Sequence, residues 1–117
     1  MQRTPQITFR GISFSEEIES HLRSRIAKLE KFYDRILDCR VMIETSHRHH
    51  QGNLYHICID LTVPGSELVV NHNPQEHQEH EDIYVAIRDA FDTAERNLKD
   101  YAQRQRGEIK THKENIV

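Results

Sequence analysis

Histidine stands out by number among the residue types that could do chemistry in this chain. The sequence holds nine histidines, and six of them gather in two polar stretches: His47, His49 and His50, then His72, His77 and His80. Imidazole nitrogens bind zinc, copper or nickel, so three of these side chains could form a metal site if the stretches met. No residue pattern fixes such a geometry. We therefore expect solvated histidines that titrate near neutral pH, with no metal site and no cofactor.

The sequence lacks the short motifs that carry catalytic chemistry. It has no G-x-S-x-G, no H-E-x-x-H, no glycine-rich phosphate loop and no cysteine pairs at zinc spacing. Its four glycines offer little with which to build a backbone cradle for phosphates. We therefore expect a non-enzymatic protein with no small-molecule substrate.

Basic side chains at helical spacing are more informative. They are Arg25, Lys28 and Lys31 in one segment and Arg96, Lys99 and Arg104 in another. Two neighbouring helices would place these rows side by side, and a double row of long cations suits an RNA helix that is recognised by shape and charge. The alternative is an ordinary solvated helix surface, with intrahelical partners such as Asp100 for Arg96.

The charge distribution allows an anionic partner although the total is negative. The formal net charge is −3 with neutral histidines, but residues 20–50 carry +3, residues 51–82 carry −6 and residues 95–117 carry +2. Only the field near a binding surface steers a partner, so the negative total does not exclude RNA.

The elements that must position these side chains follow from hydrophobic periodicity. Alternation predicts strands at 7–10, 36–45, 55–63 and 67–71, and helical spacing predicts helices at 15–33 and 81–105. A strand–helix–strand step followed by a meander predicts an α+β two-layer sandwich of β-α-β-β-β-α order, with a four-stranded mixed sheet and both helices on one face. We expect a single domain over residues 1–106 and a frayed tail over 107–117.

The cysteines and the apolar content bear on the compartment. Cys39 and Cys58 lie in apolar runs without C-x-x-C spacing, which favours buried free thiols of a reducing environment. No apolar run approaches the roughly 18 residues needed to span a bilayer, and the first residues lack the apolar core of a secretory signal. The sequence therefore predicts a cytoplasmic protein that does not enter membranes.

Two segments carry a resemblance to a known family. IAKLEKFYDRI at residues 26–36 and DIYVAIRDAFDTAERNL at residues 82–98, together with the element order, resemble the ribosome hibernation promoting factor family. That family is also called ribosome-associated inhibitor, protein Y or sigma-factor modulation protein, and its fold is similar to the double-stranded-RNA-binding fold. The resemblance covers residues 5–106, and this chain looks like the short form.

The resemblance implies a non-enzymatic translation inhibitor of resting cells. Such a protein binds the small ribosomal subunit through phosphates of its ribosomal RNA and covers the channel for messenger and transfer RNA. Arg25, Lys28, Arg96 and Arg104 match basic positions of the family, and Lys99 falls where the family often carries a polar or basic residue. Thr93, Asp100 and Ala102 depart from the family pattern, because members usually carry lysine there.

A second hypothesis comes from another class of protein. The chain could be a regulatory module that binds a protein, such as a sigma factor, through its exposed sheet face or the acidic segment 72–82. Binding that resists salt and ribonuclease would favour this alternative.

Overall fold

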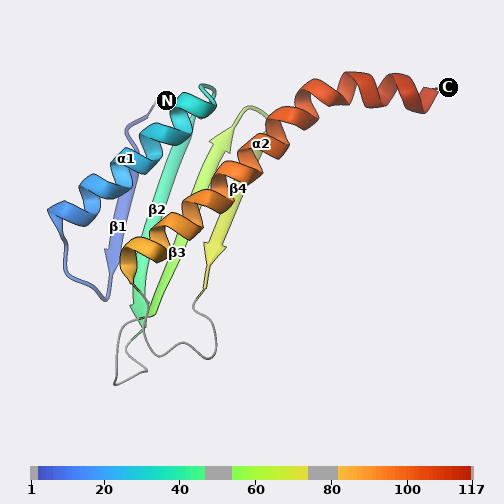
Figure 1. Ribbon diagram of the computed structural model, residues 1–117. Helices are drawn as coiled ribbons and strands as arrows, with labels where there is room; N and C mark the ends of the chain where they lie inside the picture. The colour runs from blue at the N-terminus through green and yellow to red at the C-terminus, as the bar shows by residue number, and fades with distance from the viewer. Residues whose placement is uncertain (1–2, 47–53, 74–81, 117) are drawn as a thin grey trace.

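The computed structural model describes residues 3–46, 54–73 and 82–116. Its elements are β1 (Gln6–Arg10), α1 (Glu16–Phe32), β2 (Asp38–Ser46), β3 (Leu54–Val63), β4 (Ser66–His72) and α2 (Ile83–Ile116). Figure 1 shows the two helices lying across a single sheet. The predicted β-α-β-β-β-α order is confirmed.

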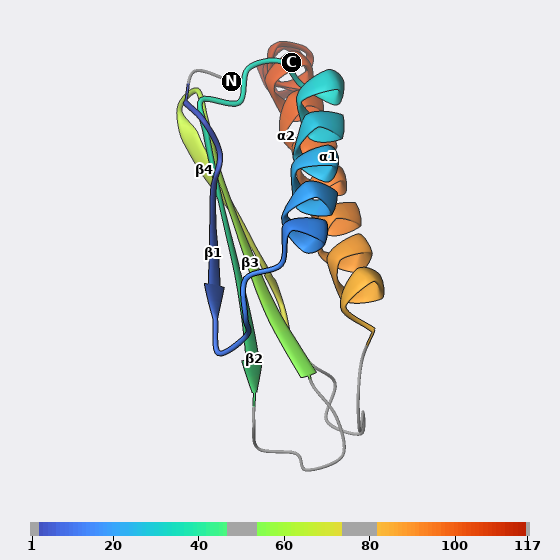
Figure 2. The ribbon, with the colours of Figure 1, turned by 90° about the vertical axis from the view of Figure 1, so that its left-hand side faces the viewer.

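The four strands form one mixed sheet in the order β1-β2-β3-β4. Strand β1 pairs with β2 in parallel, with Ile7 opposite Val41, and the chain reaches β2 through α1. The β2–β3 and β3–β4 pairs are antiparallel. Both helices cover the same face of the sheet (Figure 2). The predicted two-layer α+β sandwich is therefore confirmed.

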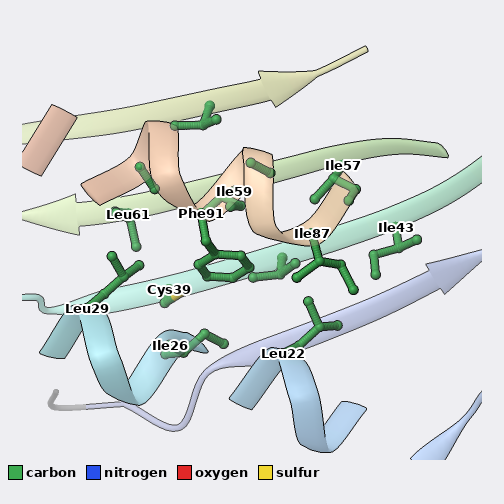
Figure 3. Packing of buried hydrophobic residues seen from close by; sticks show 14 of the residues in the cluster. Leu22, Ile26, Leu29, Cys39, Ile43, Ile57, Ile59, Leu61, Ile87 and Phe91 are labelled. Carbon is green, nitrogen blue, oxygen red and sulfur yellow. The ribbon is translucent and has the colours of Figure 1, made fainter. Parts of the chain in front are cut away.

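Alternation along the strands decides which side chains enter the core. On β3, Ile57, Ile59 and Leu61 are fully buried, whereas Cys58 and Asp60 between them are half-buried on the opposite face. The helices contribute the other side of the core through Leu22, Ile26, Leu29, Ile87 and Phe91, which meet the sheet residues in Figure 3. The core thus lies between the helix layer and one sheet face, and the other sheet face stays open.

Local hydrogen bonds fix where each helix begins. The Ser15 hydroxyl accepts a bond of 3.3 Å from the backbone N–H of Ile18, so Ser15 caps α1. The Asp82 carboxylate accepts a bond of 2.8 Å from the N–H of Tyr84 at the start of α2. Helix α1 ends where Tyr33 takes up an extended backbone.

Helix α2 extends beyond the predicted end at residue 105 and continues to Ile116. The expectation rested on the low apolar content of this segment, which governs packing onto a core rather than helix formation. Residues 103–114 are rich in Gln, Arg, Lys and Glu, which favour the helix, and no proline interrupts them. A frayed tail over residues 107–117 stays a prediction.

The two helices run in the same direction. Near their beginnings the rings of His21 and Tyr84 meet edge to face at 5.0 Å, and further along the rings of Tyr33 and Tyr101 meet at 6.1 Å. The two contacts follow in the same order along both helices, as Figure 1 also shows. The beginnings of α1 and α2 are therefore neighbours, and the end of α1 lies beside the middle of α2.

Candidate nucleic-acid interface

Charge is segregated along the helix layer. The second half of α1 with the turn after it and the middle of α2, residues 25–35 and 96–106, carry eight Lys or Arg side chains and three carboxylates. The earlier parts, residues 16–24 and 82–95, carry two arginines and seven carboxylates. Because the helices are parallel, like charges of both gather together. We call residues 25–35 and 96–106 the cationic end, and residues 16–24 and 82–95 the acidic end.

On α1 this charge order also suits the helix by itself. Its first turn carries Glu16, Glu17 and Glu19 and its last turn carries Lys31, and such charges complement the helix macrodipole by about half a kcal/mol each. Helix α2 carries no carboxylate in its first turn, so the macrodipole does not explain its charge order. The parallel arrangement places the charge gradients of the two helices side by side, so that the cationic end carries a net charge of +5.

On α1 two of the predicted RNA-binding residues face α2. With about 3.6 residues per turn, Arg25 and Lys28 lie on the same flank as His21, whose ring contacts Tyr84 of α2. Lys31 is exposed and lies on the outer side of α1, opposite the buried Leu22 and Leu29.

On α2 the predicted residues lie on different sides. Lys99 and Arg96 are exposed on the outer surface of the helix layer, and Nη2 of Arg96 donates to the Thr93 hydroxyl at 3.1 Å. Arg104 lies on the flank turned away from α1, since Ala102 and Arg106 occupy the flank beside Phe32. The sequence predicted two rows of basic side chains lying side by side. In the structure Arg25 and Lys28 lie on the flank of α1 that faces α2, whereas Arg104 lies on the far flank of α2.

None of the six predicted residues is neutralised within the described chain. The ion pairs between described residues involve other arginines, namely Arg23 with Glu19, Arg40 with Asp38 and Arg88 with Asp89. In particular, among residues 82–106 Arg96 forms no ion pair with Asp100, the intrahelical partner considered from the sequence. No carboxylate oxygen of the described residues therefore lies within 4.0 Å of the charged groups of these six side chains.

Sequence reasoning missed a pocket at the cationic end. This open pocket has a volume of about 640 Å³, and its lining includes Phe32, Tyr33, Asp34, Arg35, Gln105 and Arg106. The pocket depends on the end of α1 meeting the later part of α2, which helical spacing within one segment does not reveal. The available signal was an aromatic residue followed closely by arginine at residues 32–35.

The cysteines differ from the expectation of two buried thiols. Cys39 is buried in the core, and burial there raises its pKa to about 12, with the carboxylate of Asp38 adding to the shift. Cys58 is only half-buried on the open sheet face. It lies between the buried Ile57 and Ile59 on β3, so the alternation of the strand points its side chain away from the helices. Burial also raises the pKa of Cys58, with a further contribution from Asp60.

Thiol labelling should separate the two cysteines. The thiolate is the reactive form, so we expect iodoacetamide to modify Cys58 slowly at neutral pH and faster as the pH rises, and to reach Cys39 only after unfolding. Peptide mass spectrometry before and after denaturation measures this. A Cys58→Ser variant should remain unlabelled in the native state, and native labelling at Cys39 would contradict the core assignment.

Metal-binding and membrane-spanning features are not found in the part of the chain that the structure describes. No group of three or more potential metal-ligating side chains occurs among those residues. Among the expected loop histidines, His47, His49, His50, His77 and His80 lie outside the described residues. Within the described ranges, no helix combines the length and apolarity required to cross a bilayer.

The fold and the helix layer define a class of protein, namely small α+β domains in which two parallel helices over one sheet face expose a charged outer surface. The chain belongs to the family described as sigma 54 modulation protein / S30EA ribosomal protein, whose family model matches residues 6–106. The resemblance in the segments 26–36 and 82–98 is thereby confirmed.

Curated relatives carry names from ribosome hibernation. The chain is similar to the ribosome hibernation promotion factor of Deinococcus radiodurans, with 27% identity over 99 residues, which cover 85% of this chain and 49% of the relative. It is also similar to the ribosome hibernation promoting factor of Pseudomonas putida, with 24% identity over 99 residues, covering 85% of this chain and 86% of the relative. The chain thus spans about half the length of the Deinococcus relative.

Solved structures share the fold. A ribosomal subunit interface protein from Coxiella burnetii superposes with a TM-score of 0.68 at 14% identity, covering 84% of this chain and 96% of that one. The N-terminal domain of Thermus thermophilus Protein Y superposes with a TM-score of 0.67 at 20% identity, covering 86% and 99%. These likenesses support the two-layer architecture.

Proposed function

We propose that this chain is a ribosome hibernation factor that binds the small ribosomal subunit and blocks the channel for messenger and transfer RNA in resting cells. The observation that carries the proposal is the cationic end, where Arg25, Lys28, Lys31, Arg96, Lys99 and Arg104 make no ion pair within the described residues. The family and the names of the relatives support the same role.

The mechanism is binding and steric occlusion. Lys and Arg side chains neutralise phosphates of ribosomal RNA and release condensed counterions, which supplies affinity without base recognition. The bound domain, with its sheet behind the helices, then occupies the space that messenger and transfer RNA need. This mechanism needs no catalytic residue, no cofactor and no small-molecule substrate, and it assigns the protein to the cytoplasm, where ribosomes work.

Co-sedimentation with purified small ribosomal subunits tests the proposal. We expect the chain to pellet with the subunits at low salt, to dissociate steeply as salt rises, and to lower the yield of a cell-free translation reaction. Serum albumin at the same concentration serves as the control for trapping in the pellet. Failure to pellet at low salt, or binding that salt and ribonuclease leave unchanged, would contradict the proposal, and the second result would favour the protein-binding alternative.

A further inference from the structure

The pocket at the cationic end has the size of a ligand site. Its volume of about 640 Å³ falls within the roughly 300–1,000 Å³ of typical small-molecule sites. It combines residues from the end of α1 and the following turn with residues from α2. The pocket is therefore built by the parallel packing of the helices rather than by one loop.

Its lining joins an exposed ring to two guanidinium groups. Phe32 is 43% exposed although it is a large apolar side chain, and it lines the pocket with Arg35 and Arg106. Neither arginine lies within 4.0 Å of a carboxylate oxygen in the described chain, and Asp34 leaves the lining with a net charge of +1. An open aromatic face beside paired cations is the combination that receives a nucleobase together with its phosphate.

The side-chain amide of Gln105 is a polar group of the pocket lining that hydrogen bonds hold in position. Nε2 of Gln105 donates to the Tyr101 hydroxyl at 2.7 Å, and that hydroxyl donates to the carbonyl of Pro64. These bonds hold the Gln105 amide in place while its oxygen remains able to accept a bond from a base.

We propose that this pocket binds one unpaired nucleotide of an RNA, with the base stacked on Phe32 and the phosphate held by Arg35 and Arg106. The inference rests on the proposed function and extends it, because phosphate contacts alone recognise paired RNA without regard to unpaired bases. With this pocket the protein prefers RNA in which a base is already free of the helix.

A pair of RNA probes tests the pocket directly. One is a short duplex with a single bulged adenosine, and the other is the same duplex without the bulge; fluorescence anisotropy measures the dissociation constant of each. We expect the wild-type chain to bind the bulged duplex about 10-fold more tightly, as one stacked base allows. Phe32→Ala should abolish this preference while keeping the affinity for the plain duplex, and Phe32→Trp should retain the preference.

Phe14→Ala is the matched control, because Phe14 is also exposed, at 60%, and lies before the acidic end of α1. It should leave the preference intact, and circular dichroism checks that all variants fold. An unchanged preference in Phe32→Ala, equal binding of both probes by the wild-type chain, or an equal loss in Phe14→Ala overturns the pocket. Displacement of the bulged duplex by excess AMP as effectively as by unlabelled bulged duplex overturns the RNA assignment in favour of a free nucleotide.

The same assay keeps the two proposals apart. If the pocket alone is wrong, the plain duplex still binds and its affinity still falls when Arg25 and Lys28 are changed to Glu. If the proposed function is wrong, the wild-type chain fails to bind small subunits, and this result does not depend on Phe32.

Discussion

A variant with Arg25→Glu and Lys28→Glu should bind small ribosomal subunits on the order of 100-fold more weakly than the wild-type chain at about 0.1 M salt. Both side chains lie on the flank of α1 that faces α2, and neither forms an ion pair within the described residues. Each change removes a cation from the phosphates and adds a repelling carboxylate. The logarithmic salt dependence of binding should also flatten by about 0.7–0.9 for each lost phosphate contact.

Two further variants make the experiment specific. Arg96→Glu with Arg104→Glu tests the outer surface and far flank of α2, and should also weaken binding if the RNA spans the width of the helix layer. Arg10→Glu with Arg40→Glu is the control for an equal change of charge, because these exposed arginines line the open sheet face. Since Arg40 pairs with Asp38, circular dichroism first checks that this variant folds. Sedimentation at several salt concentrations measures all three. An equal loss in the sheet-face variant would show that total charge, rather than the cationic end, drives binding.

Truncating Ile59 to alanine should lower the free energy of unfolding by about 3–4 kcal/mol. Ile59 is fully buried at the middle of β3, where it lies opposite Val41 of β2 and Val70 of β4. Neighbours on both sides restrict how far the site can collapse, so the substitution leaves a cavity as well as losing apolar burial. The whole free energy of unfolding of a small domain is only about 5–15 kcal/mol, so this loss is large. Urea denaturation measures the change.

Val69→Ala provides the comparison for this core prediction. Val69 is 48% exposed on β4, so its truncation should cost less than about 1 kcal/mol. If both variants lost the same stability, the assignment of one buried and one open sheet face would be wrong.

Hydrophobic periodicity was sufficient to predict the elements and the buried faces. Alternation from Tyr55 to Val63 placed each side chain of β3 on its observed face, and the helix predicted at residues 15–33 began within one residue of the observed α1. The end of α2 was predicted less well, because the last residues that pack on the core do not mark the end of a helix made of strong helix formers.

The candidate site was harder to predict, because it depends on how two helices distant in sequence are rotated about their axes. Spacing within one helix showed that Arg25 and Lys28 share a flank, but not that this flank faces α2. Likewise, nothing local indicated that Arg104 lies away from α1 or that Phe32 and Arg106 line one pocket. The contacts His21–Tyr84 and Tyr33–Tyr101 fix these rotations, and each joins residues more than 60 positions apart in sequence.

The parallel course of the helices also gives the molecule a permanent electric polarity along their common direction. Near a polyanion, the field exerts a torque that turns the end of α1 and the adjoining middle of α2 toward the RNA before any atoms touch. The two molecules then meet in nearly the right orientation, which raises the association rate at low ionic strength. The lifetime of the complex depends instead on its close contacts. In a protein whose two helices ran antiparallel, the two charge gradients would cancel, and the molecule would gain no such alignment.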